Sequence, residues 1–94
     1  MAIGCAAKKR KFASAIDYWF IKGDDQLIYS DDVRGDVSTL RLSQIVAGDL
    51  AAPQVLQNQI ERKGWAILPN QEAVLYEIRS GDSTIDGIYF LKLP

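Results

Sequence analysis

The sequence contains no histidine, and this absence limits the chemistry that its side chains can perform. Ser-His-Asp and Cys-His catalysis both require an imidazole base, and histidine metal sites are excluded with them. The adjacent pairs Asp24-Asp25 and Asp31-Asp32 are the remaining candidates for acid-base work. Adjacent residues on a strand point to opposite faces, and in turns they are solvated. Since the sequence also lacks a glycine-rich phosphate-binding motif, we expect no catalytic residue, no cofactor and no enzymatic activity.

The segment from Asp31 to Asp36 places three aspartates around a glycine, a composition that suggests a calcium-binding loop. An EF-hand loop needs ligands at alternate positions and a glutamate at the twelfth position. Counted from Asp31, the third position is Val33 and the twelfth is Leu42. The register that starts one residue later fails in the same way. We therefore interpret the segment as an acidic loop and predict no metal site.

The strongest candidates for binding are the aromatic residues of one predicted hairpin. Residues 17–22 are aromatic and β-branched, which favours a strand, and residues 26–30 form a second short strand. Gly23-Asp24-Asp25 between them is typical of a three-residue hairpin loop. The sequence therefore predicts a hairpin that carries four aromatic side chains.

The two faces of the first strand in this hairpin suggest different roles. Tyr18 and Phe20 share one face, which we expect to point into the core. Trp19 and Ile21 then lie on the opposite face, where an exposed apolar patch would need to be covered by a partner. Tryptophan and tyrosine are enriched at protein interfaces. The predicted interface residues, with the acidic loop at the rim, are Trp19, Ile21, Tyr29, Asp31 and Asp32.

The middle of the chain predicts two short helices, of which the first spans residues 39–47. Ser38 suits its N-cap and Gly48 suits the position after its last turn. The apolar stripe of this helix, at i, i+3 and i+4, is Leu42, Ile45 and Val46. A strand is the alternative, because residues 40–42 alternate between leucine and arginine.

The second predicted helix spans residues 53–63. Pro53 fits a first helical turn, and Gly64 fits the position after the last one. Arg62 and Lys63 lie where the negative end of the helix dipole favours cations. The apolar stripe of this helix is Val55, Leu56 and Ile60.

Three further strands are predicted at residues 65–68, 73–79 and 85–93, the last of them apolar on both faces and therefore central or helix-covered. The fold class predicted is a single α+β domain over residues 1–94, in the order ββααβββ. Its antiparallel sheet of about five strands has two short helices packed on one face. Residues 1–14 form a flexible or helical basic N-terminal segment.

This element order also suggests a second function, a DNA-binding regulator similar to a winged helix. Helix 53–63 would be the reader and hairpin 73–93 the wing. The residues expected to contact nucleic acid are Lys8, Lys9, Arg10, Lys11, Gln54, Gln57, Asn58, Arg62 and Lys63. The hairpin, however, holds three acidic residues against two basic ones, which makes it a poor contact for phosphate.

Composition and charge favour a protein partner over nucleic acid or a membrane. The chain carries 11 basic and 12 acidic residues, a net charge of −1, so no overall field attracts nucleic acid or anionic lipid. Its single cysteine, Cys5, allows no intramolecular disulfide, which fits a reducing cytoplasm. We therefore expect a cytoplasmic, non-catalytic protein-interaction module that resembles a small accessory protein. It would form a homodimer through the aromatic hairpin or bind another protein.

Overall fold

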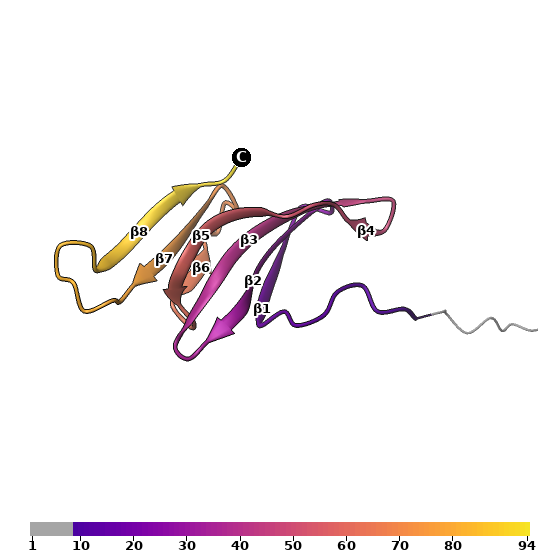
Figure 1. The fold of residues 1–94 in the computed structure, drawn as a ribbon. Helices are drawn as coiled ribbons and strands as arrows, with labels where there is room; N and C mark the ends of the chain where they lie inside the picture. The colour runs from indigo at the N-terminus through magenta and orange to yellow at the C-terminus, as the bar shows by residue number, and fades with distance from the viewer. Residues whose placement is uncertain (1–8) are drawn as a thin grey trace, which may run out of the picture.

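The computed structural model describes residues 9–94, and every regular element in that range is a β-strand. Eight strands follow one another along residues 9–94 (Figure 1). Their bounds are β1 Tyr18–Lys22, β2 Gln26–Arg34, β3 Val37–Val46, β4 Asp49–Leu50, β5 Gln54–Glu61, β6 Trp65–Ile67, β7 Ala73–Ile78 and β8 Gly87–Lys92. The predicted N-terminal segment lies outside the described residues as far as residue 8, and residues 9–14 form no helix. This part of the chain has no helix that could cross a membrane.

The first five strands form one antiparallel sheet. β1 pairs with β2 and β2 with β3, while β4 and β5 both pair with β3. A two-residue turn at Ala47 and Gly48 reverses the chain after β3. β4 and β5 therefore lie one after the other along β3. Together, β3 and its return segment form one long hairpin with β4 near its tip (Figure 1).

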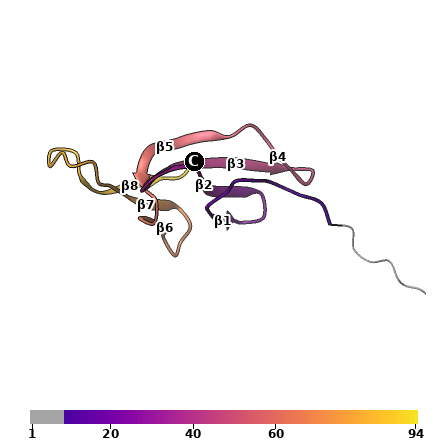
Figure 2. The ribbon, with the colours of Figure 1, turned by 60° about the horizontal axis from the view of Figure 1, so that its bottom comes forward.

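The last three strands form a second antiparallel sheet of order β6-β7-β8. Figure 2 shows this sheet against one end of the first sheet, with the β3–β4 turn extending away from it. Side chains from both sheets meet in one buried cluster. Its members are Ile28, Leu40, Leu42, Ile60, Val74, Tyr76 and Leu93. Burial of this apolar surface is what holds the two sheets together.

The predicted α+β fold is wrong, because both predicted helices are strands in the structure. Residues 39–47 lie in β3 and the turn after it. The alternation of Leu40 and Leu42 with polar neighbours is the pattern of this strand, and both leucines are buried. Gly48 does have a positive φ of 81°, as the helix prediction required, but Ala47 before it has a φ of 52°. Two successive residues with positive φ make a type I′ hairpin turn. A glycine that favours positive φ fits a helix end and a tight hairpin equally well.

The second predicted helix, residues 53–63, is replaced by β5. The pairing of β5 with β3 contains two irregularities, and Gln59 near one of them has a φ of 55°. Ile60 is fully buried and Leu56 packs against the same core; their spacing of four residues favours a helix, but in β5 the irregular pairing lies between them, so regular strand alternation does not apply. Gly64, predicted as a helix end, instead allows close packing: a Cβ there would lie 3.0 Å from the Cβ of Glu61.

The predicted strands of the two hairpins are confirmed, with changes in their lengths and surroundings. β1 and β2 are joined by the predicted three-residue loop, since Lys22 pairs with Gln26. The acidic segment predicted as a loop is mostly strand, because β2 continues to Arg34 and only Gly35 and Asp36 turn the chain. The last strand, β8, is an edge strand and not a central or helix-covered one.

Candidate protein interface

Trp19 is the most exposed of the residues predicted to form the interface. It lies on β1, and 65% of its surface is accessible to solvent. Within the described chain, β1 pairs with β2 alone, so its other edge presents unpaired backbone groups. An edge strand with an exposed tryptophan combines apolar surface with backbone hydrogen-bonding capacity. Both properties suit the addition of a strand from a partner.

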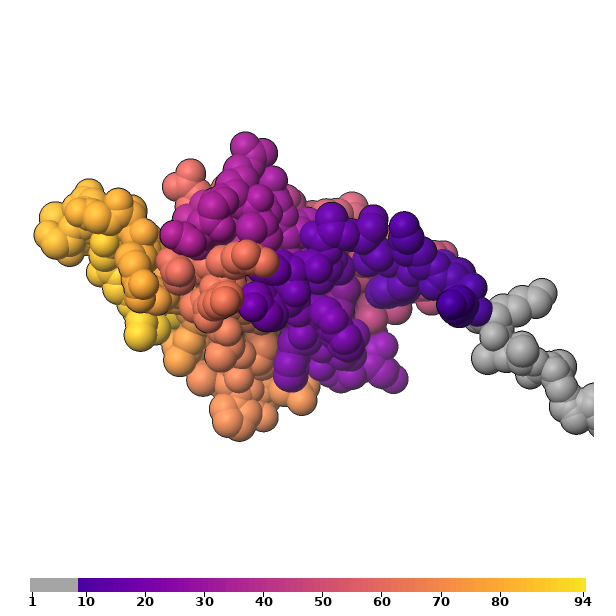
Figure 3. Space-filling view, turned by 90° about the horizontal axis from the view of Figure 1, so that it is seen from below, coloured from indigo at the N-terminus to yellow at the C-terminus, as the bar shows by residue number. Residues whose placement is uncertain are grey.

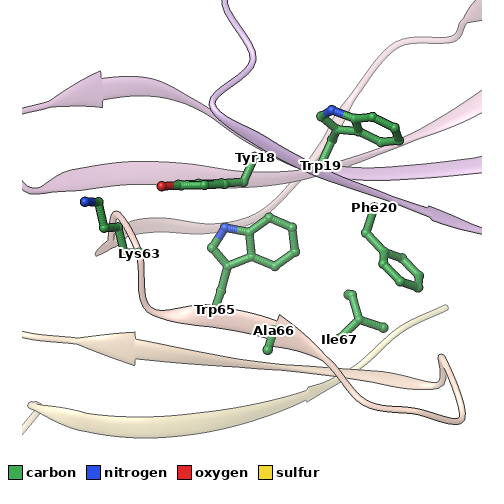
Figure 4. A pocket seen from close by; sticks show the side chains of 7 residues that line it. All are labelled: Tyr18, Trp19, Phe20, Lys63, Trp65, Ala66 and Ile67. Atoms are coloured by element: carbon green, nitrogen blue, oxygen red, sulfur yellow. The ribbon is translucent and has the colours of Figure 1, made fainter.

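A groove of about 340 Å³ runs between β1 and the short strand β6 (Figure 4). Tyr18 and Phe20 line it on the β1 side, and Trp65 and Ile67 line it on the β6 side. Lys63 lies near the Tyr18 end of the groove. Figure 3 shows the surface where the β1 segment meets the segment around residue 65. The groove is therefore apolar along its length, with a cation at one end.

A buried serine fixes the position of both walls of this groove. The Oγ atom of Ser30 accepts a hydrogen bond from the indole Nε1 of Trp65 at 3.3 Å. The same atom accepts a second hydrogen bond from the backbone N–H of Tyr18, also at 3.3 Å. Ser30 is fully buried on β2, so both donors are satisfied within the fold. The shared acceptor holds Trp65 against the first sheet while its outer side remains open to the groove.

A second hollow, of about 550 Å³, lies on the other face of β1. The segment of residues 11–16 borders it together with Trp19, Ile21 and Leu27. Residues 11–16 therefore cover part of the face that is predicted to need a partner. Ile21 is half-buried there, whereas Trp19 remains largely exposed. Trp19 borders both hollows, which makes it the central residue of this surface.

The other predicted interface residues stabilise the hairpin. Tyr29 is buried, and its hydroxyl shares a hydrogen bond with that of Ser43 at 3.2 Å. Asp31 is half-buried and accepts a hydrogen bond of 2.6 Å from Nε of Arg41, which raises the pKa of the guanidinium above its ordinary value. Asp32 is exposed beside the irregularity in β2 and pairs with its neighbour Arg34. These residues maintain the strand pairing behind β1.

The residues predicted to contact nucleic acid are not brought together on one surface. Lys8 lies outside the described residues, and Arg10 bonds to Asp49 and to the carbonyl oxygen of Gly48 at the tip of the long hairpin. Gln57 accepts a hydrogen bond from the hydroxyl of Tyr76, and Arg62 is engaged by Asp17. The remaining residues of that set are exposed at separate places, namely Lys9, Lys11, Gln54, Asn58 and Lys63.

The winged-helix alternative depended on a helix at residues 53–63. β5, Gln54–Glu61, occupies that position, so the structure offers no reader helix for a DNA groove. Lys63 lies instead at the end of the apolar groove.

Sequence reasoning missed two parts of the apolar surface. Trp65, in the predicted strand 65–68, packs against the core and also lines the groove opposite β1. The last strand exposes Ile88 to 74% and Phe90 to 64%. A signal for this second patch was present, since a strand that is apolar on both faces needs cover on both. No protein-family model, no curated protein and no solved structure matches this chain.

Proposed function

We propose that this protein is a non-catalytic protein-interaction module that associates with further copies of itself through the β1 edge. Trp19 would be the anchor of the interface, and the apolar groove between β1 and β6 would receive part of the partner. The mode of binding is the addition of a strand to an open sheet edge, in which the backbone provides affinity and the groove provides specificity. We further propose that it acts in the cytoplasm, as its single cysteine allows no internal disulfide.

The observation that carries this proposal is the exposure of Trp19 on an edge strand. A tryptophan with 65% of its surface in water is costly to leave uncovered, and tryptophan is the residue type most enriched among binding hot spots. The neighbouring groove adds apolar walls from Phe20 and Trp65. Exposed single apolar residues are common on monomers, but a continuous apolar surface along an open strand edge marks an interaction site.

Light scattering coupled to size-exclusion chromatography tests the proposal. The wild-type chain, of mass 10.5 kDa, is expected to elute as an assembly heavier than one chain. Trp19→Glu should elute at the mass of one chain, because the new carboxylate cannot be buried without a counter-charge. Val46→Glu is the matched control, since Val46 is an exposed apolar strand residue at the far end of the long hairpin. A wild-type chain that remains a monomer at high concentration contradicts the proposal.

A further inference from the structure

The β7–β8 hairpin projects beyond the body of the molecule and carries a second apolar surface. Its loop lies at the opposite end of the molecule from residues 9–16 (Figures 1 and 3). Ile88 and Phe90 are two residues apart on β8, so they share one face, and Ile85 in the loop is also exposed. In the described part of the chain, β8 pairs only with β7. The hairpin thus combines an open strand edge with apolar side chains that remain exposed among residues 9–94.

The end of this hairpin has a defined shape. Asp86 accepts hydrogen bonds from the backbone N–H groups of Ser80 and Gly81, at 2.7 and 2.9 Å. Asp82 accepts bonds from both the backbone N–H and the hydroxyl of Thr84, at 2.9 and 2.7 Å. These bonds hold the pKa values of both carboxyl groups below their ordinary value, so both stay ionised. A preformed loop loses little conformational entropy when it binds.

The strand region of the hairpin is also anchored to the core. The rings of Tyr76 on β7 and Tyr89 on β8 stack with their centroids 5.5 Å apart and their planes at 10°. The hydroxyl of Tyr89 donates a hydrogen bond to the carbonyl oxygen of Ile85, and that of Tyr76 donates to Gln57 on β5. The exposed face of β8 is therefore held in a fixed position relative to the first sheet.

The hairpin and the β1 groove are complementary in charge, apolarity and strand length. The hairpin holds three acidic residues against Arg79 and Lys92; Arg79 pairs with Glu77, and the two aspartates lie in the loop, at the opposite end of β8 from Lys92. The residues that line the groove include one cation, Lys63, and no acidic residue. Both surfaces are otherwise apolar and lie on open strand edges, β8 with six residues and β1 with five. One surface can therefore pair with the other on a second copy.

We propose that the β7–β8 hairpin of one copy docks on the β1 edge of a second copy, with β8 added beside β1. Ile88 and Phe90 then cover the apolar groove, and the aspartates of the loop lie near Lys63. Such a contact is heterologous, because different surfaces of the two copies meet, and repetition of it produces a ring or an open filament. This inference rests on the proposed function, since it names the partner of the β1 edge.

A mixing experiment with two variants tests the head-to-tail contact. Trp19→Glu removes the receiving surface and keeps the hairpin, whereas Ile88→Glu removes the hairpin surface and keeps the β1 edge. Each variant alone is expected to be a monomer by light scattering, with a dissociation constant raised at least about tenfold. A mixture of the two in equal amounts should form a dimer and nothing larger, because it contains one intact hairpin and one intact receiving edge. Circular dichroism of each variant confirms that both remain folded.

The outcomes separate the inference from the proposed function. If Ile88→Glu assembles like the wild type while Trp19→Glu is a monomer, the β1 edge binds but the hairpin is not its partner, and the inference is overturned. Two monomeric variants that fail to form a dimer when mixed overturn it as well. If Trp19→Glu assembles like the wild type, the proposed function itself fails. Phe90→Ser, which introduces no charge, provides a second hairpin variant with the same expected loss of assembly.

Discussion

Arg62, just beyond the end of β5, donates two hydrogen bonds to the carboxylate of Asp17, just before β1. Nε lies 2.9 Å from Oδ2, and Nη2 lies 3.0 Å from Oδ1. β1 and β5 are the outermost strands of the first sheet, so this pair joins its two edges across the strands between them. The fork of a guanidinium matches a carboxylate in this geometry, which lysine cannot reproduce.

This ion pair predicts a specific dependence of stability on pH. The hydrogen bonds from Arg62 hold the pKa of Asp17 below its ordinary value of 3.8. The pKa of Asp17 is lower in the folded state than in the unfolded state. The stabilisation by this ion pair is therefore fully present above about pH 3.8 and is lost as the pH falls through the folded-state pKa. Asp17→Asn should therefore unfold at a lower temperature than the wild type at pH 7, and the difference should shrink towards pH 2. Thermal unfolding followed by circular dichroism measures both.

Arg62→Lys should lower the unfolding temperature at pH 7 as Asp17→Asn does, because one ammonium group cannot make both hydrogen bonds. Arg79→Lys is the matched control. Arg79 pairs with Glu77, two residues away on the exposed hairpin, so the change should have little effect. Equal effects of the two substitutions would show that the Arg62 pair does not hold the sheet edges together.

The turn between β3 and β4 predicts a stabilising substitution. Ala47 has a φ of 52°, a left-handed conformation that costs alanine about 1 kcal/mol and that asparagine adopts more readily. Ala47→Asn should therefore raise the free energy of unfolding by about 0.5–1 kcal/mol in urea denaturation. In a helix the same substitution would lower it by about 0.5 kcal/mol. Ala51→Asn, outside the turn, serves as the control. A loss of stability in Ala47→Asn but not in Ala51→Asn would contradict a hairpin turn at Ala47 and Gly48.

Two buried serines of β3 predict opposite responses to alanine. Among the described residues, Oγ of Ser38 has no hydrogen-bond partner, so Ser38→Ala removes a buried polar atom. Its free energy of unfolding should be unchanged or up to about 1 kcal/mol higher. Ser43→Ala leaves the buried hydroxyl of Tyr29 unpaired and should cost about 1–3 kcal/mol. Urea denaturation compares the two, and a larger cost for Ser38→Ala would be inconsistent with this assignment.

The packing of the core predicts which residues of β3 contribute most to the free energy of unfolding. Leu40 is fully buried between the sheets, so Leu40→Ala should lower the free energy of unfolding by about 2–5 kcal/mol. Val46 is exposed at the end of β3, and Val46→Ala should change the same quantity by less than about 0.5 kcal/mol. A helix with Leu42, Ile45 and Val46 on its buried face would give a much larger cost at Val46. Urea denaturation of both variants decides between the two arrangements.

Local patterns predicted part of the fold well. The hairpin of β1 and β2 was predictable because the aromatic run, the Gly23-Asp24-Asp25 loop and the second apolar run are adjacent in sequence. The last two strands were predictable from the alternation in residues 73–79 and the apolar run that follows Gly81. In these segments the pairing partner is close along the chain, so local propensity and tertiary structure agree.

The middle of the chain was mispredicted because its signals support two structures. Gly48 and Pro53 mark the ends of helices, but they also fit a hairpin turn and the start of an edge strand. Irregular pairing in β5 hides the strict alternation that identifies a strand. The choice between helix and strand for residues 54–61 depends on the pairing with β3, because the backbone groups of β5 form their hydrogen bonds across the sheet.

The sequence alone determined the set of side chains that this protein has for chemistry or binding: no histidine, a nearly balanced charge and an aromatic run beside a turn. Tertiary structure alone decided the surroundings of several other apolar residues. Tyr29 became part of the packed interior, Trp65 packs against the core while it lines the groove, and Ile88 and Phe90 were left exposed on the edge strand β8. The reason is physical: the face of a strand that is buried depends on which sheet packs against it, and this contact joins residues that are distant in the chain.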